Sequence, residues 1–405
     1  MEEKNIKRGW MFLHRKELVL LCILVLQVGF AIFWGTQKVG FHVDEIYSYG
    51  LSNGHIQPFL CDQEDYYNQW HDADYINDYL TVSTDEQFSY GNVYYNQTQD
   101  VHPPLFYFLL HTVCSFFPGR FSKWFCICIN LACFCVSIYL TCSFSRRLFR
   151  NSWFSIVPAV CYGFSLGAMN SIIYLRMYML LTMLCLLFLR LSQKYRRQHR
   201  FKHFNVVGLF AVTFLGMLTH YYFMIFVFFA FLCYLLFLGL QKRVREALIY
   251  SITVLAGILA SVAAYPAMLT HVFGGYRGRE ALENAIEASG FLQKLGNYVK
   301  IINLELFGGF IWVTILGIVL ALGICIFLHR YDIRIKSETD GWTFYFKKHE
   351  PESKERTYKL YVSKSFPDAL AVSVTSIGYV LAIAMLTTVQ EDRYILCVFP
   401  MLLIT

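Results

Sequence analysis

Apolar residues recur along this chain in blocks of about 20, the length that an α-helix needs to cross the hydrocarbon core of a bilayer. Charged residues gather between the blocks, so the pattern predicts an all-α, polytopic membrane protein with about ten transmembrane helices in one domain, residues 1–405. The expected spans are 17–36, 122–143, 152–173, 175–192, 204–220, 221–240, 247–269, 301–328, 367–388 and a tenth from about 394. The tenth block holds only about a dozen residues, which indicates a truncated sequence or an unfinished last helix.

The segment 105–119, LFYFLLHTVCSFFPG, decides the topology because it is apolar but short. Segments of this length are more often interfacial than spanning. If 105–119 does not cross and the N-terminus is cytoplasmic, 26 of the 35 Lys and Arg residues lie in the cytoplasm, against 13 if it crosses. Positive charge collects in cytoplasmic loops, so we expect the first arrangement. Loops 37–121 and 270–300 then lie outside, and loop 329–366 lies in the cytoplasm, where TYKLYVS predicts a small strand.

The composition agrees with a protein that lies in a membrane. Hydrophobic residues make up 56% of the chain and charged residues 16%, whereas a soluble domain carries roughly 25% charged residues. The net charge of +7 therefore reflects the placement of loops and does not indicate a nucleic-acid partner. Twelve of the 13 cysteines fall in apolar blocks, where Cys acts as a small apolar residue, and no CxxC pair predicts a zinc site.

The stretch FHVDEIYSYG, residues 41–50, places candidate chemistry just beyond the first span, at the start of the acidic outer loop. Acidic loop residues usually cap helices or face water, but carboxylates this close to hydrocarbon are costly and often functional. A carboxylate at this interface can act as a general base. Adjacent helical residues point about 100° apart, so we expect only one of the two carboxylates to face the substrate. We expect Asp44 to be that residue and to act as the base. Glu45 is then a structural or metal-coordinating support.

Other polar side chains are expected on the same outer face. His102 precedes a Pro pair and an apolar helix, and a cation at a helix N-terminus suits phosphate. The glycine-rich stretch HVFGGYRGRE, 271–280, is typical of a flexible lid. A single Arg or Tyr at the end of a span is as commonly a membrane anchor. The candidates are His102, Arg176, Arg277, Arg279 and Arg393 for a phosphate group, and His42, Tyr178, His220 and Tyr221 for other substrate contacts.

The chain resembles the GT-C membrane glycosyltransferases, in the branch of the protein O-mannosyltransferases and the bacterial aminoarabinose (lipid A) transferases. The motifs that carry the likeness, in order, are Asp44-Glu45, His102-Pro103-Pro104-Leu105, Arg176-Met177-Tyr178, Thr219-His220-Tyr221, and Arg393-Tyr394 with Pro400. The resemblance implies a polyprenyl-phosphate sugar as donor, Asp44 as base, and a cation before the Pro pair in contact with the donor phosphate. In the family that cation is often Lys, whereas here it is His102; Tyr174 and Tyr178 stand near the Arg-Met-Tyr turn, where an acidic neighbour is common.

These features predict a membrane glycosyltransferase of the hexosyl or pentosyl class. It would transfer a sugar from a polyprenyl-phosphate donor to a hydroxyl of a glycan, lipid or protein acceptor. One base with direct displacement predicts inversion at the anomeric carbon, in contrast to the paired carboxylates of glycoside hydrolysis. His102, Arg176 and Arg393 would stabilise the phosphate charge as it develops. The sequence requires no cofactor, although the acidic loop could hold a divalent cation.

Two other classes remain open: a transporter or flippase for lipid-linked sugars, and a non-catalytic scaffold that binds polyprenyl lipid. No expected span carries a charge at its middle, and ion-coupled transporters usually need midplane polar groups, so catalysis is favoured. The expected location is a membrane, the plasma membrane in a bacterial host, with the N-terminus in the cytoplasm and the active site on the other face.

Overall fold

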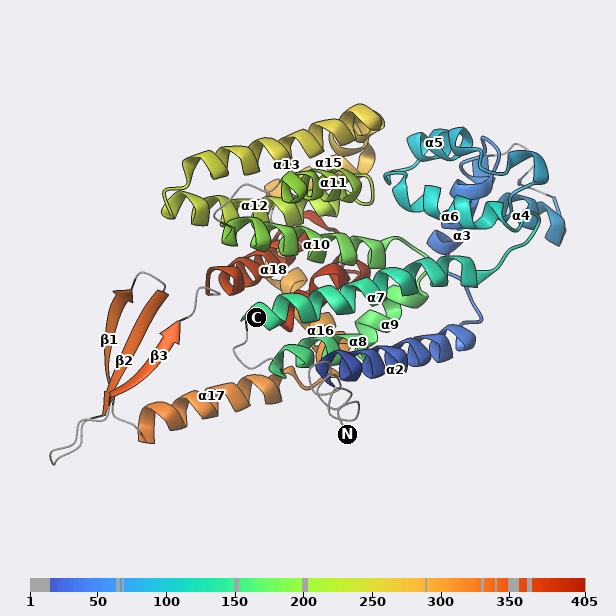
Figure 1. The fold of residues 1–405 in the computed structure, drawn as a ribbon. Coiled ribbons are helices and arrows are strands. Elements are labelled where there is room, and N and C mark those ends of the chain that lie inside the picture. The colour runs from blue at the N-terminus through green and yellow to red at the C-terminus, as the bar shows by residue number, and fades with distance from the viewer. Residues whose placement is uncertain are drawn as a thin grey trace, which may run out of the picture.

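The computed structural model describes residues 15–62, 66–67, 69–148, 153–198, 203–287, 290–328, 331–338, 341–348, 357–362 and 366–404. The basic residues Lys4, Lys7 and Arg8, which helped to orient the first span, lie outside these ranges. Within them the chain is a bundle of long helices that run side by side, with short helices at one end and a small sheet at the other (Figure 1).

The bundle is that of an integral membrane protein, as the apolar blocks predict. In the part of the chain that the structure describes, five helices are long and apolar enough to cross a bilayer: α2 (Arg15–Gln37), α7 (Lys123–Leu148), α12 (Tyr222–Leu240), α13 (Val244–Ala264) and α18 (Phe366–Leu386). Two bent pairs raise the number to seven, if each pair is one span. They are Phe154–Gly163 (η3 and α8) with α9 (Leu166–Ile173), bent by 54°, and α16 (Phe291–Phe307) with the first part of α17 (Ile311–Leu328), bent by 84°.

The remaining expected spans are shorter or less apolar. Helix α10 (Tyr178–Arg197) carries four basic residues in its second half, and α11 (His203–Met217) has only 15 residues. The tenth block forms η5 (Asp392–Tyr394), η6 (Leu396–Val398) and α19 (Phe399–Leu402).

Loop 37–121 folds into short helices. They are α3 (Val43–Asn53), η1 (Leu60–Asp62), α4 (Ala73–Leu80), η2 (Thr84–Glu86), α5 (Tyr90–Gln99) and α6 (Leu105–Ser115). Helix α6 begins directly after Pro104, and its 11 residues span about 16 Å, too short to cross. The backbone N–H of Leu105 donates to the carbonyl of Leu218, 2.9 Å away, which holds the start of α6 against the turn between α11 and α12.

A three-stranded antiparallel sheet stands beyond the far end of α17 (Figure 1). Its strands are β1 (Tyr331–Glu338), β2 (Gly341–Lys348) and β3 (Thr357–Val362), in that order across the sheet. In the register, Ile335 lies opposite Phe344, and Phe346 lies opposite Tyr358. The strand expected at TYKLYVS is β3. The other two strands were not foreseen, and they add a small β element to the helical membrane fold.

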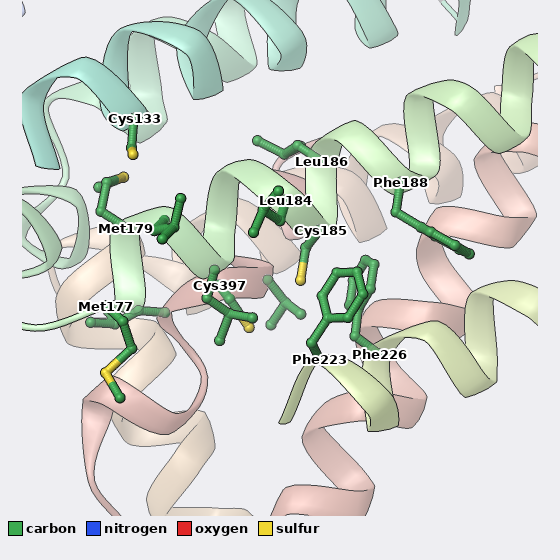
Figure 2. Packing of buried hydrophobic residues seen from close by; sticks show 14 of the residues in the cluster. Cys133, Met177, Met179, Leu184, Cys185, Leu186, Phe188, Phe223, Phe226 and Cys397 are labelled. Carbon is green, nitrogen blue, oxygen red and sulfur yellow. The ribbon is translucent and has the colours of Figure 1, made fainter. Parts of the chain in front are cut away.

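The apolar core is centred on α10. Figure 2 shows Cys185 of α10 beside Phe223 and Phe226 of α12 and Cys397 of η6. The ring of Phe188, also in α10, lies 6.1 Å from the ring of Phe223. A small residue lets α11 approach α12: a Cβ on Gly216 of α11 would lie 2.2 Å from the ring of Phe223 in α12. This close packing sets the turn from α11 to α12.

The segment between α13 and α16 is helical where the sequence suggested a flexible loop. It contains α14 (Ala267–Leu269), the π-helical turn η4 (Thr270–Gly274) and α15 (Tyr276–Glu287). A Cβ on Gly278 would lie 2.0 Å from the carbonyl oxygen of Val272, so glycine is needed there for close backbone approach rather than for a hinge.

Candidate active site

The site begins with the cap of α3. His42 is the N-cap residue, and its Nδ1 accepts from the backbone N–H of Asp44 at 3.1 Å. The Glu45 carboxylate accepts from the backbone N–H of His42 at 2.7 Å, which completes a capping box. Two donors at the start of α3 are thereby satisfied, and the direction of the Asp44 side chain is fixed.

Glu45 is a structural anchor. Its side chain is 1% exposed, and it accepts from the backbone N–H of Leu175 at 2.8 Å and pairs with Lys38 at 2.9 Å. A buried carboxylate is stable only when it is paired and hydrogen-bonded in this way. These contacts tie α3 to the turn between α9 and α10.

Asp44 faces outward, next to two groups from distant segments. Its Oδ2 lies 3.2 Å from Nη1 of Arg393 and accepts a hydrogen bond from the Tyr174 hydroxyl, also at 3.2 Å. Arg393 donates in turn to that hydroxyl at 2.7 Å. The Asp44 side chain is 30% exposed, and Oδ1 accepts no hydrogen bond from any described residue. One carboxylate oxygen is therefore fixed and the other is open.

Arg176 lies behind Asp44, in the turn between α9 and α10, and is 4% exposed. Its Nη1 donates to the backbone carbonyl of Asp44 at 3.1 Å, and its Nη2 lies 3.1 Å from Nε2 of His102. Its Nε is buried without a hydrogen-bond partner in the described part of the chain. A buried cationic donor without a partner is costly, so Nε is suited to an anionic ligand.

His102 contacts Asp100 as well as Arg176. Its Nδ1 lies 2.8 Å from Oδ2 of Asp100. Burial lowers the pKa of His102; Asp100 opposes this shift, and the charge of Arg176 adds to it. Burial by itself raises the pKa of Asp100, but the interactions with His102, the charge of Arg176 and a hydrogen bond from the backbone of Val101 outweigh burial, so the net shift is downward. The resemblance implied a cation at His102, whereas the structure places the ring between a carboxylate and a guanidinium.

Two of the expected substrate-binding residues form an aromatic wall beside this group. The ring of His220 lies 5.6 Å from His102 and 5.6 Å from Tyr178, and Tyr178 stacks on Tyr174 at 6.0 Å. Burial lowers the pKa of His220 well below its usual value, with further contributions from His102 and Arg176. A neutral His220 and the tyrosines can pack against an uncharged ring.

Tyr221 points to a different neighbourhood. Its hydroxyl lies 2.8 Å from Nδ1 of His271 in η4, and Nε2 of His271 lies 3.3 Å from the carbonyl oxygen of Thr98 in α5. Tyr221 therefore joins the start of α12 to η4 and the outer-loop helices. It supports the frame of the site from outside the Asp44 group.

Arg277 and Arg279 are not brought to Asp44. Arg277 is exposed and pairs with Glu280 on the same helix, α15, at 2.9 Å. Among the described contacts, neither arginine reaches Asp44, Arg176 or Arg393.

Sequence reasoning missed Tyr174 and Asp100 as members of the group. Tyr174 was noted only as a departure from the family pattern, yet it bridges Asp44 and Arg393. Each lies two residues from a candidate, Arg176 or His102, which was the available signal. In the described ranges, no three His, Cys, Asp or Glu side chains are grouped as metal ligands.

The fold has counterparts of known structure. Two crystal structures of ArnT from Cupriavidus metallidurans, one bound to undecaprenyl phosphate and one in the apo state, each match with a TM-score of 0.50 and 13% identity. Each match covers 98% of this chain and 59% of the ArnT chain, so this chain spans under two thirds of their length. No family model and no curated protein matches the sequence. The fold is GT-C-like, as the order of motifs predicted.

Proposed function

We propose that this protein is a membrane glycosyltransferase that transfers a sugar from a polyprenyl-phosphate-linked donor to an acceptor hydroxyl on the non-cytoplasmic face. The observation that carries the proposal is Asp44, with one oxygen held by Arg393 and Tyr174 and the other open, beside the unpartnered Nε of Arg176. A base and cations are the groups that such a transfer needs. The match to a structure bound to undecaprenyl phosphate supports the class of donor.

The proposed reaction is a single displacement. Oδ1 of Asp44 removes the proton of the acceptor hydroxyl while the hydroxyl oxygen attacks the anomeric carbon of the donor sugar. The bond from that carbon to the phosphate oxygen breaks, and its electron pair stays on the polyprenyl phosphate. Arg176 and Arg393 stabilise this charge. Attack from the face opposite the leaving group inverts the configuration.

The neighbouring side chains have supporting roles in this proposal. Glu45 and His42 fix the start of α3, and Tyr174 aligns Arg393 with Asp44. Tyr178 and His220 form one wall of the sugar site. Arg277 and Arg279 stay outside the catalytic group, because the described contacts of Arg277 lie within α15.

The first test replaces Asp44 with Asn in purified protein that is given a radiolabelled polyprenyl-phosphate sugar and a broad acceptor mixture. General-base catalysis is worth about 10²–10⁴-fold, so release of polyprenyl phosphate should fall by at least about 100-fold. Asp74→Asn, at an exposed position in the first turn of α4, is the matched control and should keep wild-type turnover. Equal turnover by Asp44→Asn and wild type would refute the base. Tight donor binding without turnover by either would favour a carrier or scaffold.

A further inference from the structure

We infer that His102 acts as a neutral positioning residue that aims Arg176, and that Nε of Arg176, rather than His102, contacts the phosphate of the lipid donor. This inference rests on the proposed function, because it names the group at the same site that holds the leaving phosphate. It assigns to His102 a neutral role, whereas the resemblance implied a cation at this position.

The direction of two hydrogen bonds defines the state of His102. The guanidinium of Arg176 has only N–H donors, so Nε2 of His102, 3.1 Å away, must accept. A ring with an accepting Nε2 carries its proton on Nδ1, which then donates to Asp100 at 2.8 Å. The chain from Asp100 through His102 to Arg176 is consistent only when His102 is neutral.

A second proton on His102 would break this chain. It would place an N–H on Nε2 against the N–H of Arg176 Nη2, and two positive charges 3.1 Å apart. The charged and titratable groups around the ring are Asp100 in its own segment, Arg176 in the α9–α10 turn, Asp44 in α3 and His220 in the α11–α12 turn. Burial and Arg176 disfavour the protonated ring, and Asp100 opposes them.

The same contacts leave one edge of Arg176 for a ligand. Nη1 is held by the carbonyl of Asp44 and Nη2 by His102, so the plane of the guanidinium is fixed from two sides. Nε is buried and without a partner among the described residues. The backbone carbonyl of Asp44 holds Nη1, so the Arg176 guanidinium is fixed next to the residue proposed as base. A phosphate oxygen bound to Nε would therefore place the leaving group close to Asp44.

The deciding experiment compares His102→Gln with His102→Lys. Glutamine keeps an acceptor oxygen for Arg176 without charge, whereas lysine supplies a permanent cation that repels Arg176. The measurements are kcat and KM for the labelled donor from pH 5 to 8, and binding of undecaprenyl phosphate alone to detergent-solubilised protein. His55→Gln and His55→Lys, at a side chain that is 61% exposed, are matched controls. Thermal unfolding of each variant tests its folding.

We expect His102→Gln to keep activity within about fivefold, and His102→Lys to lose at least about 30-fold with weaker undecaprenyl phosphate binding, in line with the 1.5–3 kcal/mol of a charge-assisted hydrogen bond. Wild-type activity should fall on the acid side as His102 gains a proton, at a pH below the usual histidine pKa. This acid limb should be absent in His102→Gln.

Two results would overturn the inference: full activity in His102→Lys with loss in His102→Gln, or an unchanged acid limb in folded His102→Gln. Failure of the proposed function gives a different pattern. If no variant or wild type turns over donor, the binding of undecaprenyl phosphate still separates the two substitutions, and equal binding by both would refute the positioning role by itself.

Discussion

At the scale of the residue, Asp44 and Glu45 show how adjacent carboxylates receive different environments. Glu45 is buried and bound to backbone N–H groups and Lys38, whereas Asp44 is partly exposed and keeps one oxygen open. The separation follows from the α-helix, which turns neighbouring side chains about 100° apart. The capping box determines which of the two faces inward.

Tyr174 gives a prediction at this scale. Replacement by Phe keeps the ring that stacks on Tyr178 but removes the hydroxyl between Asp44 and Arg393. A hydrogen bond to a charged group is worth about 1.5–3 kcal/mol, so we expect kcat to fall at least about tenfold with little change in thermal stability. Tyr67→Phe, at an exposed position in loop 37–121, is the control and should leave kcat unchanged. Unchanged kcat in Tyr174→Phe would contradict the alignment role.

At the scale of the element, the turn between α9 and α10 organises the site. It carries Tyr174 and Arg176 and receives the buried Glu45. Asn130, in the first third of α7, holds this turn: its Nδ2 donates to the carbonyls of Ile172 at 3.1 Å and Tyr174 at 3.0 Å. The Asn130 side chain is buried, so solvent water does not reach these carbonyls to replace the amide.

Asn130→Leu should therefore lower both stability and activity. The substitution keeps the approximate volume but removes both hydrogen bonds of the Asn130 amide. The carbonyl of Tyr174 keeps the backbone N–H of Arg176, 2.7 Å away, so the cost of an unpaired carbonyl, about 1–3 kcal/mol, falls on Ile172. We expect a lower unfolding temperature in detergent and a reduced kcat, because the turn that carries Arg176 loosens. Cys128→Leu, at an exposed position on the same helix, is the control and should change neither. If Asn130→Leu kept the wild-type unfolding temperature and kcat, the α9–α10 turn would not depend on the Asn130 side chain.

At the scale of the whole molecule, polar clusters stand at the two ends of α10. Arg176 and Tyr178 lie at its start, in the site, and about 30 Å away its last turn carries Arg196 and Arg197. Both of these arginines bind Asp368 at the start of α18, at 2.8 and 2.7 Å. Helix α10 thus connects the proposed site to this arginine-rich cluster, and the excess of arginine marks the end we propose as cytoplasmic.

The sidedness can be tested by cysteine labelling in intact cells. In a Cys61→Ser background, Asp74→Cys in α4 and Glu338→Cys in β1 place a thiol at opposite ends of the bundle (Figure 1). We expect an impermeant maleimide to label Asp74→Cys in intact cells and Glu338→Cys only after permeabilisation. The reverse pattern would place the site in the cytoplasm and refute the proposed topology.

The sequence by itself determined the membrane solvent, because the length of an apolar block is a local property of the chain, and the order of its motifs indicated the GT-C-like fold. The bias of basic loops predicts the outer placement of loop 37–121. The sequence also brought Asp44, His102, Arg176 and Arg393 to attention by their residue types at the ends of apolar segments. Periodicity states that a residue lies at an interface, but it does not state which partner it meets there.

Only the tertiary structure decided those partners. Packing of α3 against the α9–α10 turn bound Glu45 and left Asp44 open, and the contact of α6 with the α11–α12 turn set His102 between Asp100 and Arg176. Because residues 276–287 fold into α15, Arg277 pairs with Glu280 on the same helix. Hydrogen bonds act over about 3 Å, so the role of each polar side chain depends on neighbours that distant segments supply only after folding.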